Sequence, residues 1–300
     1  MKPDLVTVLR CPACADRLAL DGRTARCAQG HAYDLAKQGY LNLMPAASNG
    51  IEGDSAAMVG ARTVFLGTGH YAAIRDALIL EAELGAGPGT EPGTETATET
   101  GTQLEAGLGV DDLVVEVGAG TGYYLAGVLG ASEHRRGIAL DVSKYAARRA
   151  AKLDPRIASV VCDAWRELPI IDDSAQVLLN VFAPRNAKEM ARILAPGGRL
   201  LVVTPNQQHL AELVDVLGMV SVDEEKERRL QDSLSGEFER TGGEVIEETM
   251  TLDRTAVEQL VLMTPSARHL DYRELLQQIA ALPEPSVVTL SVTLSTWQAR

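Results

Sequence analysis

Four potential metal ligands lie close together near the start of this 300-residue chain. They are Cys11, Cys14, Cys27 and His31, and their spacing is C-x2-C-x12-C-x3-H. Three thiolates and one imidazole at this spacing are typical of a tetrahedral zinc site, and the histidine disfavours an iron–sulfur cluster, which uses thiolates. Because four protein ligands leave no position for a water molecule, we expect the ion to be structural rather than catalytic.

The residues around these ligands predict a zinc ribbon. A tight turn separates the members of each ligand pair, and residues 17–27 between the pairs predict a β-hairpin with Asp21 and Gly22 as its two-residue turn. A module of this size buries too little apolar surface to fold alone. We therefore expect residues 1–44 to form a ribbon that depends on zinc for its folding and that recognises a partner.

A second group of residues with a chemical signature follows a predicted strand at residues 113–117. Gly118, Gly120 and Gly122 come directly after this strand, and an apolar helical pattern begins at Tyr123. A strand, a glycine-rich turn and a helix form the front of a nucleotide-binding βα unit. The dinucleotide fingerprint G-x-G-x-x-G is incomplete because Tyr123 stands where its third glycine would be, so the glycines alone could also serve only a tight turn.

Acidic residues end the next two predicted strands. The strand over residues 136–141 ends at Asp141, 19 residues after Gly122, where a carboxylate can accept hydrogen bonds from both hydroxyls of a ribose. The strand over residues 159–163 ends at Asp163, which could meet an adenine. Both acids could instead be helix caps, which are common after strands.

The rest of the chain continues an alternating α/β pattern. Residues 176–180 predict a fourth strand, and residues 191–205 predict a helix, a Pro-Gly-Gly turn and a fifth strand. The tail adds β-rich runs at 244–252 and 286–297, with helical patterns at 255–262 and 272–282.

The order of Glu116, three glycines, two strand-end acids and a Pro-Gly-Gly turn resembles the class I S-adenosylmethionine-dependent methyltransferases. This resemblance implies an α/β, Rossmann-like fold over residues 110–300, with a seven-stranded sheet whose final pair is antiparallel. It also implies that Glu116 and the two acids lie at the cofactor. Tyr123 and Tyr124 could pack within the first helical turn, or one of them could face the cofactor sulfonium through a cation–π contact.

The net charge of −13 argues against a polyanionic partner, but the acidity is unevenly distributed. Residues 81–112 contain eight acidic and no basic residues, whereas residues 1–40 contain six basic and four acidic residues. The Gly, Thr, Glu and Pro composition of residues 85–109 predicts a disordered acidic linker, with an acidic mimic of nucleic acid as the alternative. No apolar run is long enough for a membrane span and the N-terminus does not read as a secretory signal, so we expect a cytoplasmic protein with no membrane contact.

A narrower resemblance extends over nearly the whole chain except the acidic linker. It rests on the stretch CPACADRLALDGRTARCAQGHAYDLAKQGYLNLM, on GDSAAMVGARTVFLGTGHYAAIRDAL, and on the motifs GAGTGYY, LDVSK, NVFAPRN and TPNQQHLAEL. These motifs resemble the bacterial 23S rRNA guanine-N1 methyltransferases, including the actinobacterial type linked to resistance to tylosin and related macrolides.

The resemblance implies properties that the residues alone do not. It implies zinc on the four ligands named above, and S-adenosylmethionine against Tyr71, the turn through Tyr124 and His209. It implies that residues 45–84 form a helical connector that covers the cofactor site, and it suggests a 23S rRNA hairpin as substrate and a homodimer as the assembly. From the residues alone, Tyr71 would be assigned to the hydrophobic core and His209 to a solvated loop.

The acceptor atom that the resemblance implies, guanine N1, determines what the active site must do. Guanine N1 lies on the Watson–Crick edge and carries a proton, so the base must be unpaired and extruded before the nitrogen can attack. Asn180 and Phe182 lie at the end of the fourth strand, where such folds hold the acceptor, and we expect them in the target-base pocket. Phe182 could stack on the guanine or be core; the sequence identifies no general base.

Basic side chains of the ribbon would dock RNA phosphates. They are Arg10, Arg17, Arg23, Arg26 and Lys37. Two other function classes stay open at this point: a small-molecule methyltransferase whose ribbon is purely structural, and a non-catalytic RNA-binding protein with an unused cofactor pocket.

Overall fold

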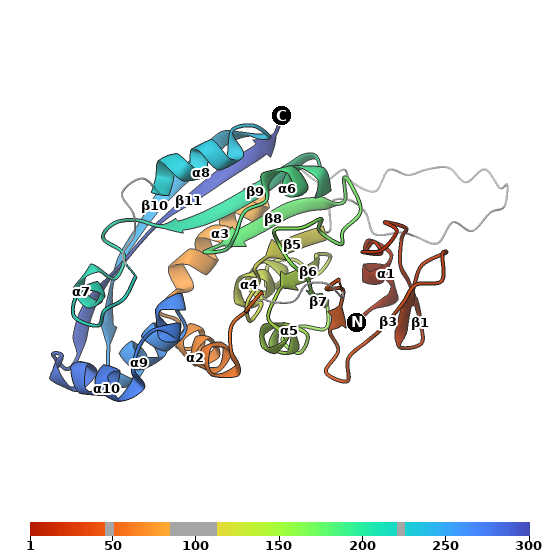
Figure 1. Ribbon diagram of the computed structural model, residues 1–300. Coiled ribbons are helices and arrows are strands. Elements are labelled where there is room, and N and C mark those ends of the chain that lie inside the picture. The colour runs from red at the N-terminus through yellow and green to blue at the C-terminus, as the bar shows by residue number, and fades with distance from the viewer. Residues whose placement is uncertain (46–50, 85–112, 221–225) are drawn as a thin grey trace.

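A computed structural model describes residues 1–45, 51–84, 113–220 and 226–300 (Figure 1). The predicted acidic linker at 85–109 and the start of the methyltransferase region at 110 lie outside these described residues. No helix in the described ranges is both long and apolar enough to cross a membrane.

An eight-stranded mixed sheet forms the centre of the molecule, in the order β10-β11-β9-β8-β5-β6-β7-β4. Its strands are β4 (Leu41–Asn42), β5 (Leu113–Val117), β6 (Arg136–Asp141), β7 (Ile157–Val161), β8 (Ala175–Val181), β9 (Leu194–Pro205), β10 (Phe238–Leu252) and β11 (Ser286–Ala299). The strands from β9 to β4 pair in parallel, and β11 is antiparallel to both β9 and β10. The predicted seven-stranded class I sheet with its antiparallel final pair is therefore confirmed, and the structure adds an eighth strand.

The eighth strand, β4, comes from the end of the predicted zinc ribbon. Leu41 and Asn42 pair in parallel with Val160 and Val161 of β7. Leu41 and Leu43 are almost fully buried, so burial of these two side chains accounts for the extension of the sheet.

Helices cover both faces of the sheet. They are α1 (Pro3–Val6), α2 (Ala56–Gly67), α3 (Ala72–Leu84), α4 (Tyr123–Gly130), α5 (Lys144–Ala150), α6 (Ala187–Ile193), α7 (Ala211–Val214), α8 (Lys226–Leu234), α9 (Arg254–Leu262) and α10 (Tyr272–Ala281). Along β5, Val114 packs in one core cluster and Leu113, Val115 and Val117 in another, as the alternation of side chains in a strand requires. The first cluster includes side chains from α2, α3, α4, α9 and α10, and the second includes side chains from α1, α6 and the ribbon.

The ribbon itself contains a three-stranded antiparallel sheet of β1 (Ala19–Asp21), β2 (Thr24–Arg26) and β3 (Ala32–Asp34). The predicted hairpin is present, but its turn is displaced by one residue. Asp21 pairs with Thr24, so the turn residues are Gly22 and Arg23 rather than Asp21 and Gly22. Gly22 has a φ of +60°, a conformation that glycine adopts without strain, and this places it at the first turn position.

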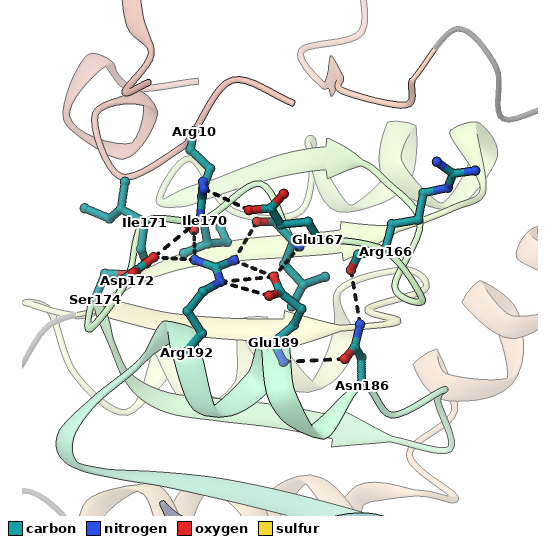
Figure 2. A network of polar contacts seen from close by, with 11 residues as sticks. Arg10, Arg166, Glu167, Ile170, Ile171, Asp172, Ser174, Asn186, Glu189 and Arg192 are labelled. Atoms are coloured by element: carbon teal, nitrogen blue, oxygen red, sulfur yellow. Dashed lines mark hydrogen bonds and ion pairs between the residues drawn. The ribbon is translucent and has the colours of Figure 1, made fainter. Parts of the chain in front are cut away.

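An ion-pair network joins Arg10 of the ribbon to the segment between β7 and β8 and to α6 (Figure 2). An Arg10 guanidinium nitrogen lies 2.8 Å from a Glu167 oxygen and another lies 3.4 Å from Oδ1 of Asp172. Arg192 of α6 lies 2.6 Å from the same Asp172 oxygen and also pairs with Glu189. Arg10 is thus committed to an internal contact, which corrects its assignment as a phosphate-binding residue.

Backbone and apolar contacts strengthen the same junction. Leu9 pairs with Ile170 in an antiparallel bridge, and the Ile171 N–H donates to the Val8 carbonyl at 2.9 Å. Leu5, Leu9 and Leu18 are buried in the cluster that includes one face of the sheet. The ribbon therefore shares a core with the methyltransferase sheet.

Candidate functional site

A cavity of about 690 Å³ lies at the carboxyl ends of the central parallel strands, where open α/β sheets bind ligands. Most of the residues predicted to meet the cofactor or the target base line it: Tyr71, Glu116, Gly118, Gly120, Tyr123, Tyr124, Asp141, Asp163, Phe182 and His209. Gly122 and Asn180 do not line it. The structure thus brings together residues that are up to 138 positions apart in the chain, such as Tyr71 and His209.

The glycine turn after β5 depends on the absence of side chains. A Cβ on Gly118 would lie 2.4 Å from the Cβ of Ala183, so the turn packs directly on the loop after β8. Gly122 has a φ of +78° and is the N-cap residue of α4. It therefore shapes the turn instead of contacting a ligand in the cavity.

Asp141 anchors the turn and faces the cavity. Its two carboxylate oxygens accept backbone N–H bonds from Gly120 and Ser143, each at 2.7 Å. The side chain that caps α5 is Ser143, so the helix-cap alternative for Asp141 does not hold. Burial nevertheless raises the pKa of Asp141, with the two backbone bonds opposing the shift. Each oxygen keeps a further lone pair for a ligand hydroxyl.

Asp163 occupies the corresponding position after β7. It is buried, its Oδ1 accepts the Trp165 N–H at 2.9 Å, and the Arg166 Nε lies 3.4 Å from its Oδ2. Trp165 also lines the cavity and is 65% exposed, which is unusual for a side chain of its size.

Glu116 lies below the glycine turn and is almost fully buried. Its Oε2 accepts the Leu125 N–H at 3.2 Å. Burial raises the pKa of Glu116 to about 8, a shift that this hydrogen bond opposes and that the nearby Asp141 charge adds to. Glu116 is therefore mostly protonated at neutral pH.

This raised pKa predicts a specific pH dependence of stability. Between the usual value of 4.5 and about 8, the folded protein holds a proton on Glu116 that the unfolded chain has lost. The free energy of unfolding should therefore fall as pH rises through this window, by a total on the order of 5 kcal/mol. Glu116→Gln, which mimics the protonated form, should lack this contribution in chemical unfolding measured from pH 5 to pH 8.5. Equal pH slopes for the two proteins would contradict the assignment.

An aromatic cluster also lines the cavity. The Phe182 and His209 rings are stacked with centroids 5.9 Å apart, and Tyr71 lies 6.4 Å and 6.1 Å from them. The Ser291 N–H donates to His209 Nδ1 at 3.3 Å, so the neutral ring carries its proton on Nε2, which lies 3.3 Å from the Tyr71 hydroxyl. Tyr71 is buried and His209 half-buried, so His209 is not a solvated loop residue.

Phe182 has an unusual backbone conformation. Its φ is +52°, although it is neither glycine nor a small polar residue, and its N–H is held by the Val203 carbonyl at 3.1 Å. Its side chain is 42% exposed, which excludes the core alternative. Strained residues of this kind cluster at functional sites.

Asn180 differs from its prediction as a wall of the target-base pocket. It is fully buried and its Nδ2 donates to the Pro184 carbonyl at 2.9 Å. Its Oδ1 has no partner within the described residues. Because strand β8 turns this side chain into the protein, Asn180 holds the loop that follows Phe182 and does not face a base.

Residues 51–54 line the cavity and were not identified as site residues from the sequence. The Ser143 hydroxyl donates to the Asp54 carbonyl at 2.6 Å, and the Asp54 side chain pairs with Arg62 of α2. Arg62 also donates to the Met263 carbonyl at 2.6 Å, and Arg268 lies 3.8 Å from Asp54. Only the family resemblance of the surrounding motif indicated that this segment lies at the cofactor site.

The four predicted metal ligands converge within the ribbon, with all ligand atoms within 4.8 Å of one another. The Cys14 and Cys27 sulfurs are 3.7 Å apart, and His31 Nδ1 lies 3.4 Å from Cys27 Sγ and 3.6 Å from Cys11 Sγ. A tetrahedral zinc ion with the usual bond lengths requires edges of roughly 3.5 to 3.8 Å. The cluster therefore fits Zn²⁺, with His31 ligating through Nδ1.

Known proteins resemble both parts of the chain. Residues 9–49 match the family described as "RlmA, N-terminal", and residues 115–202 match a methyltransferase domain. The chain is 45% identical over 295 residues, 98% of each protein, to the 23S rRNA (guanine(748)-N(1))-methyltransferase of Streptomyces fradiae. The chain belongs to the 23S rRNA (guanine-N1)-methyltransferase family.

Two further matches accompany this relative. A Micromonospora griseorubida protein named "Putative 23S rRNA (guanine-N(1)-)-methyltransferase" is 44% identical over 99% of both chains. The solved structure of MccD protein is 13% identical with a TM-score of 0.43, over 64% of this chain and 91% of that one. The predicted family is confirmed, as are the predicted cofactors, S-adenosylmethionine and one structural Zn²⁺.

Proposed function

We propose that this protein transfers a methyl group from S-adenosylmethionine to N1 of a guanine in 23S rRNA. The observation that carries the proposal is Phe182, an exposed aromatic ring held in a strained conformation in the cavity that the glycine turn and Asp141 also line. An unpaired base can stack on such a ring. Membership of the family supports guanine N1 as the acceptor.

We assign different roles to the residues that line the cavity. We assign Asp141 and the glycine turn to the ribose and methionine parts of the cofactor, and Asp163 to its adenine. Tyr71 and His209 hold the wall on which Phe182 presents its ring. When bound, S-adenosylmethionine would supply the methyl group; N1 would lose its proton to water as it accepts the methyl carbon, and the sulfur would keep the electron pair of the broken carbon–sulfur bond. Positioning and the exclusion of water are the main demands on the protein.

Primer extension tests the proposal directly. The purified protein is incubated with S-adenosylmethionine and unmodified 23S rRNA, and the RNA is then reverse transcribed. Methylation at N1 blocks Watson–Crick pairing, so we expect one new strong stop next to a single guanine. Transfer to a metabolite without an rRNA stop would favour a small-molecule methyltransferase, and no transfer at all would reject the proposal.

The ribbon would guide the RNA into the cavity. A hollow of about 360 Å³ between the ribbon and the sheet shares Cys162 and Asp163 with the lining of the main cavity. Arg17 and Lys37 are exposed and have no ion pair within the described residues. Arg23 instead donates to the Leu35 and Ala36 carbonyls, at 3.1 and 2.9 Å, and so serves the ribbon itself.

The double variant Arg17→Gln/Lys37→Gln tests this docking. Loss of two phosphate contacts should weaken rRNA binding and reduce the slope of log affinity against log salt concentration by about 1.5 to 2. Cofactor affinity should not change, because neither side chain lines the cavity. Arg148→Gln/Arg273→Gln removes two exposed charges elsewhere and serves as the matched control. A double variant whose salt slope equals that of the wild type would reject the docking surface.

The proposal also covers the RNA element, the biological consequence, the location and the assembly of the protein. We propose a hairpin as the RNA element, macrolide resistance as a consequence of methylation, a cytoplasmic location where 23S rRNA is found, and a homodimer. A homodimer would give twice the chain mass of 32.0 kDa in light scattering. The division into a ribbon (1–44), a connector (45–84), a linker (85–109) and a methyltransferase domain (110–300) also remains our proposal.

A further inference from the structure

The loop after β8 carries a charged side chain that the assignments above do not use. Arg185 lines the main cavity together with Phe182, three residues earlier in the same loop. It is half-buried, and burial lowers the pKa of its guanidinium. Its side chain has no hydrogen bond or ion pair within the described residues.

The other arginines of the cavity have partners. Arg62 pairs with Asp54 and donates to the Met263 carbonyl, and Arg268 donates to the Glu52 carbonyl at 3.0 Å. A partly desolvated guanidinium without an acceptor costs free energy. The position of Arg185 is therefore explained best by an acceptor that arrives with the substrate.

The loop that carries Arg185 is held at three points. The Phe182 N–H donates to Val203, Ala183 packs on the glycine turn at Gly118, and Asn180 donates to the Pro184 carbonyl. The loop therefore presents the Phe182 ring and the Arg185 guanidinium to the cavity in a fixed relation. An aromatic ring and a cation together suit a flipped nucleotide, which offers both a planar base and anionic oxygens.

We propose that Arg185 binds an anionic oxygen of the target nucleotide, either O6 of the guanine as N1 loses its proton or the adjoining phosphate. This inference rests on the proposed function, because it assigns Arg185 to the nucleotide that accepts the methyl group. In the first case the N1 proton passes to water at the cavity mouth, and the electron pair left on the base is shared between N1 and O6. Arg185 would then stabilise the charge on O6 while the N1 pair forms the bond to the methyl carbon.

Two substitutions of Arg185 distinguish guanine O6 from the phosphate as the oxygen that it binds. Arg185→Gln removes the charge and Arg185→Lys keeps it, while Arg273→Gln on α10 is the matched control at an exposed arginine. Single-turnover methylation of 23S rRNA is measured at saturating RNA across pH, and RNA affinity is measured across salt concentration. Calorimetry with S-adenosylhomocysteine verifies that each variant folds and keeps its cofactor site.

If Arg185 meets O6, Arg185→Gln should lower the saturated rate about 10²-fold and shift its pH profile upward, with RNA affinity little changed. If it meets the phosphate, RNA affinity should fall and the salt slope should drop by about 0.9, with the saturated rate unchanged. In both cases Arg185→Lys should recover part of the loss. A variant that matches the wild type in rate, affinity and salt slope would overturn this inference alone, whereas a wild type without rRNA methylation would overturn the proposed function.

Discussion

Replacing Cys11 with serine should release the zinc ion and unfold the ribbon. The four ligands converge on one point, and a site that loses a thiolate loses most of its affinity for the metal. The consequence extends beyond the ribbon because Leu5, Leu9 and Leu18 are buried against the sheet. Exposure of these side chains costs about 1.5 to 3 kcal/mol each, so the melting temperature should drop by at least 10 °C.

Metal analysis and thermal unfolding measure this outcome. The wild type should contain one zinc per chain, and Cys11→Ser should contain almost none. Cys162→Ala is the matched control, because Cys162 is buried but lies outside the cluster. It should keep its zinc. Full zinc occupancy in Cys11→Ser would show that the cluster does not hold the metal in the way described.

Replacing Phe182 should slow methyl transfer strongly, and the alanine and glycine variants should differ in stability. Loss of the stacking ring should reduce the transfer rate about 10²-fold or more, because a base that is not held in line reacts slowly. Cofactor affinity should change much less, since the glycine turn and Asp141 are untouched. Both Phe182→Ala and Phe182→Gly should show this loss in rate.

The two variants should differ in stability. Alanine keeps the cost of a φ of +52°, whereas glycine adopts this conformation freely, so Phe182→Gly should be more stable than Phe182→Ala by about 1 kcal/mol. At an ordinary loop or strand position the order would be reversed. Chemical unfolding of the two variants measures the difference. Near-normal methylation by either variant would contradict the role of the ring, and a more stable alanine variant would contradict the strain.

The predictable parts of this fold are those that short stretches determine. Strands β5, β6 and β8 contain short apolar runs whose positions follow from the sequence, as do the acids Asp141 at the end of β6 and Asp163 just after β7 (Ile157–Val161). The zinc cluster follows from ligand spacing alone. Strand β4 could not be predicted, because a two-residue pairing with β7 has no periodicity to detect.

The remaining site residues depend on contacts between distant segments. Arg62 reaches the Met263 carbonyl 201 residues later, and no local pattern reports such a contact. Tyr71 and His209 were identified only through the family resemblance, since a buried tyrosine and a loop histidine carry no signal of their own. Asn180 was wrongly predicted to face the target base, because a polar residue at a strand end suggests a functional site. The direction of its side chain determines its role, and this side chain is buried in the protein.

Nucleoside analysis by mass spectrometry tests the central claim most directly. Unmodified 23S rRNA is incubated with the protein and S-adenosylmethionine that carries a deuterated methyl group, and the RNA is digested to nucleosides. We predict labelled N1-methylguanosine at no more than one per rRNA molecule. Label on another nucleoside, on another atom of guanine, or nowhere in the RNA would contradict the account.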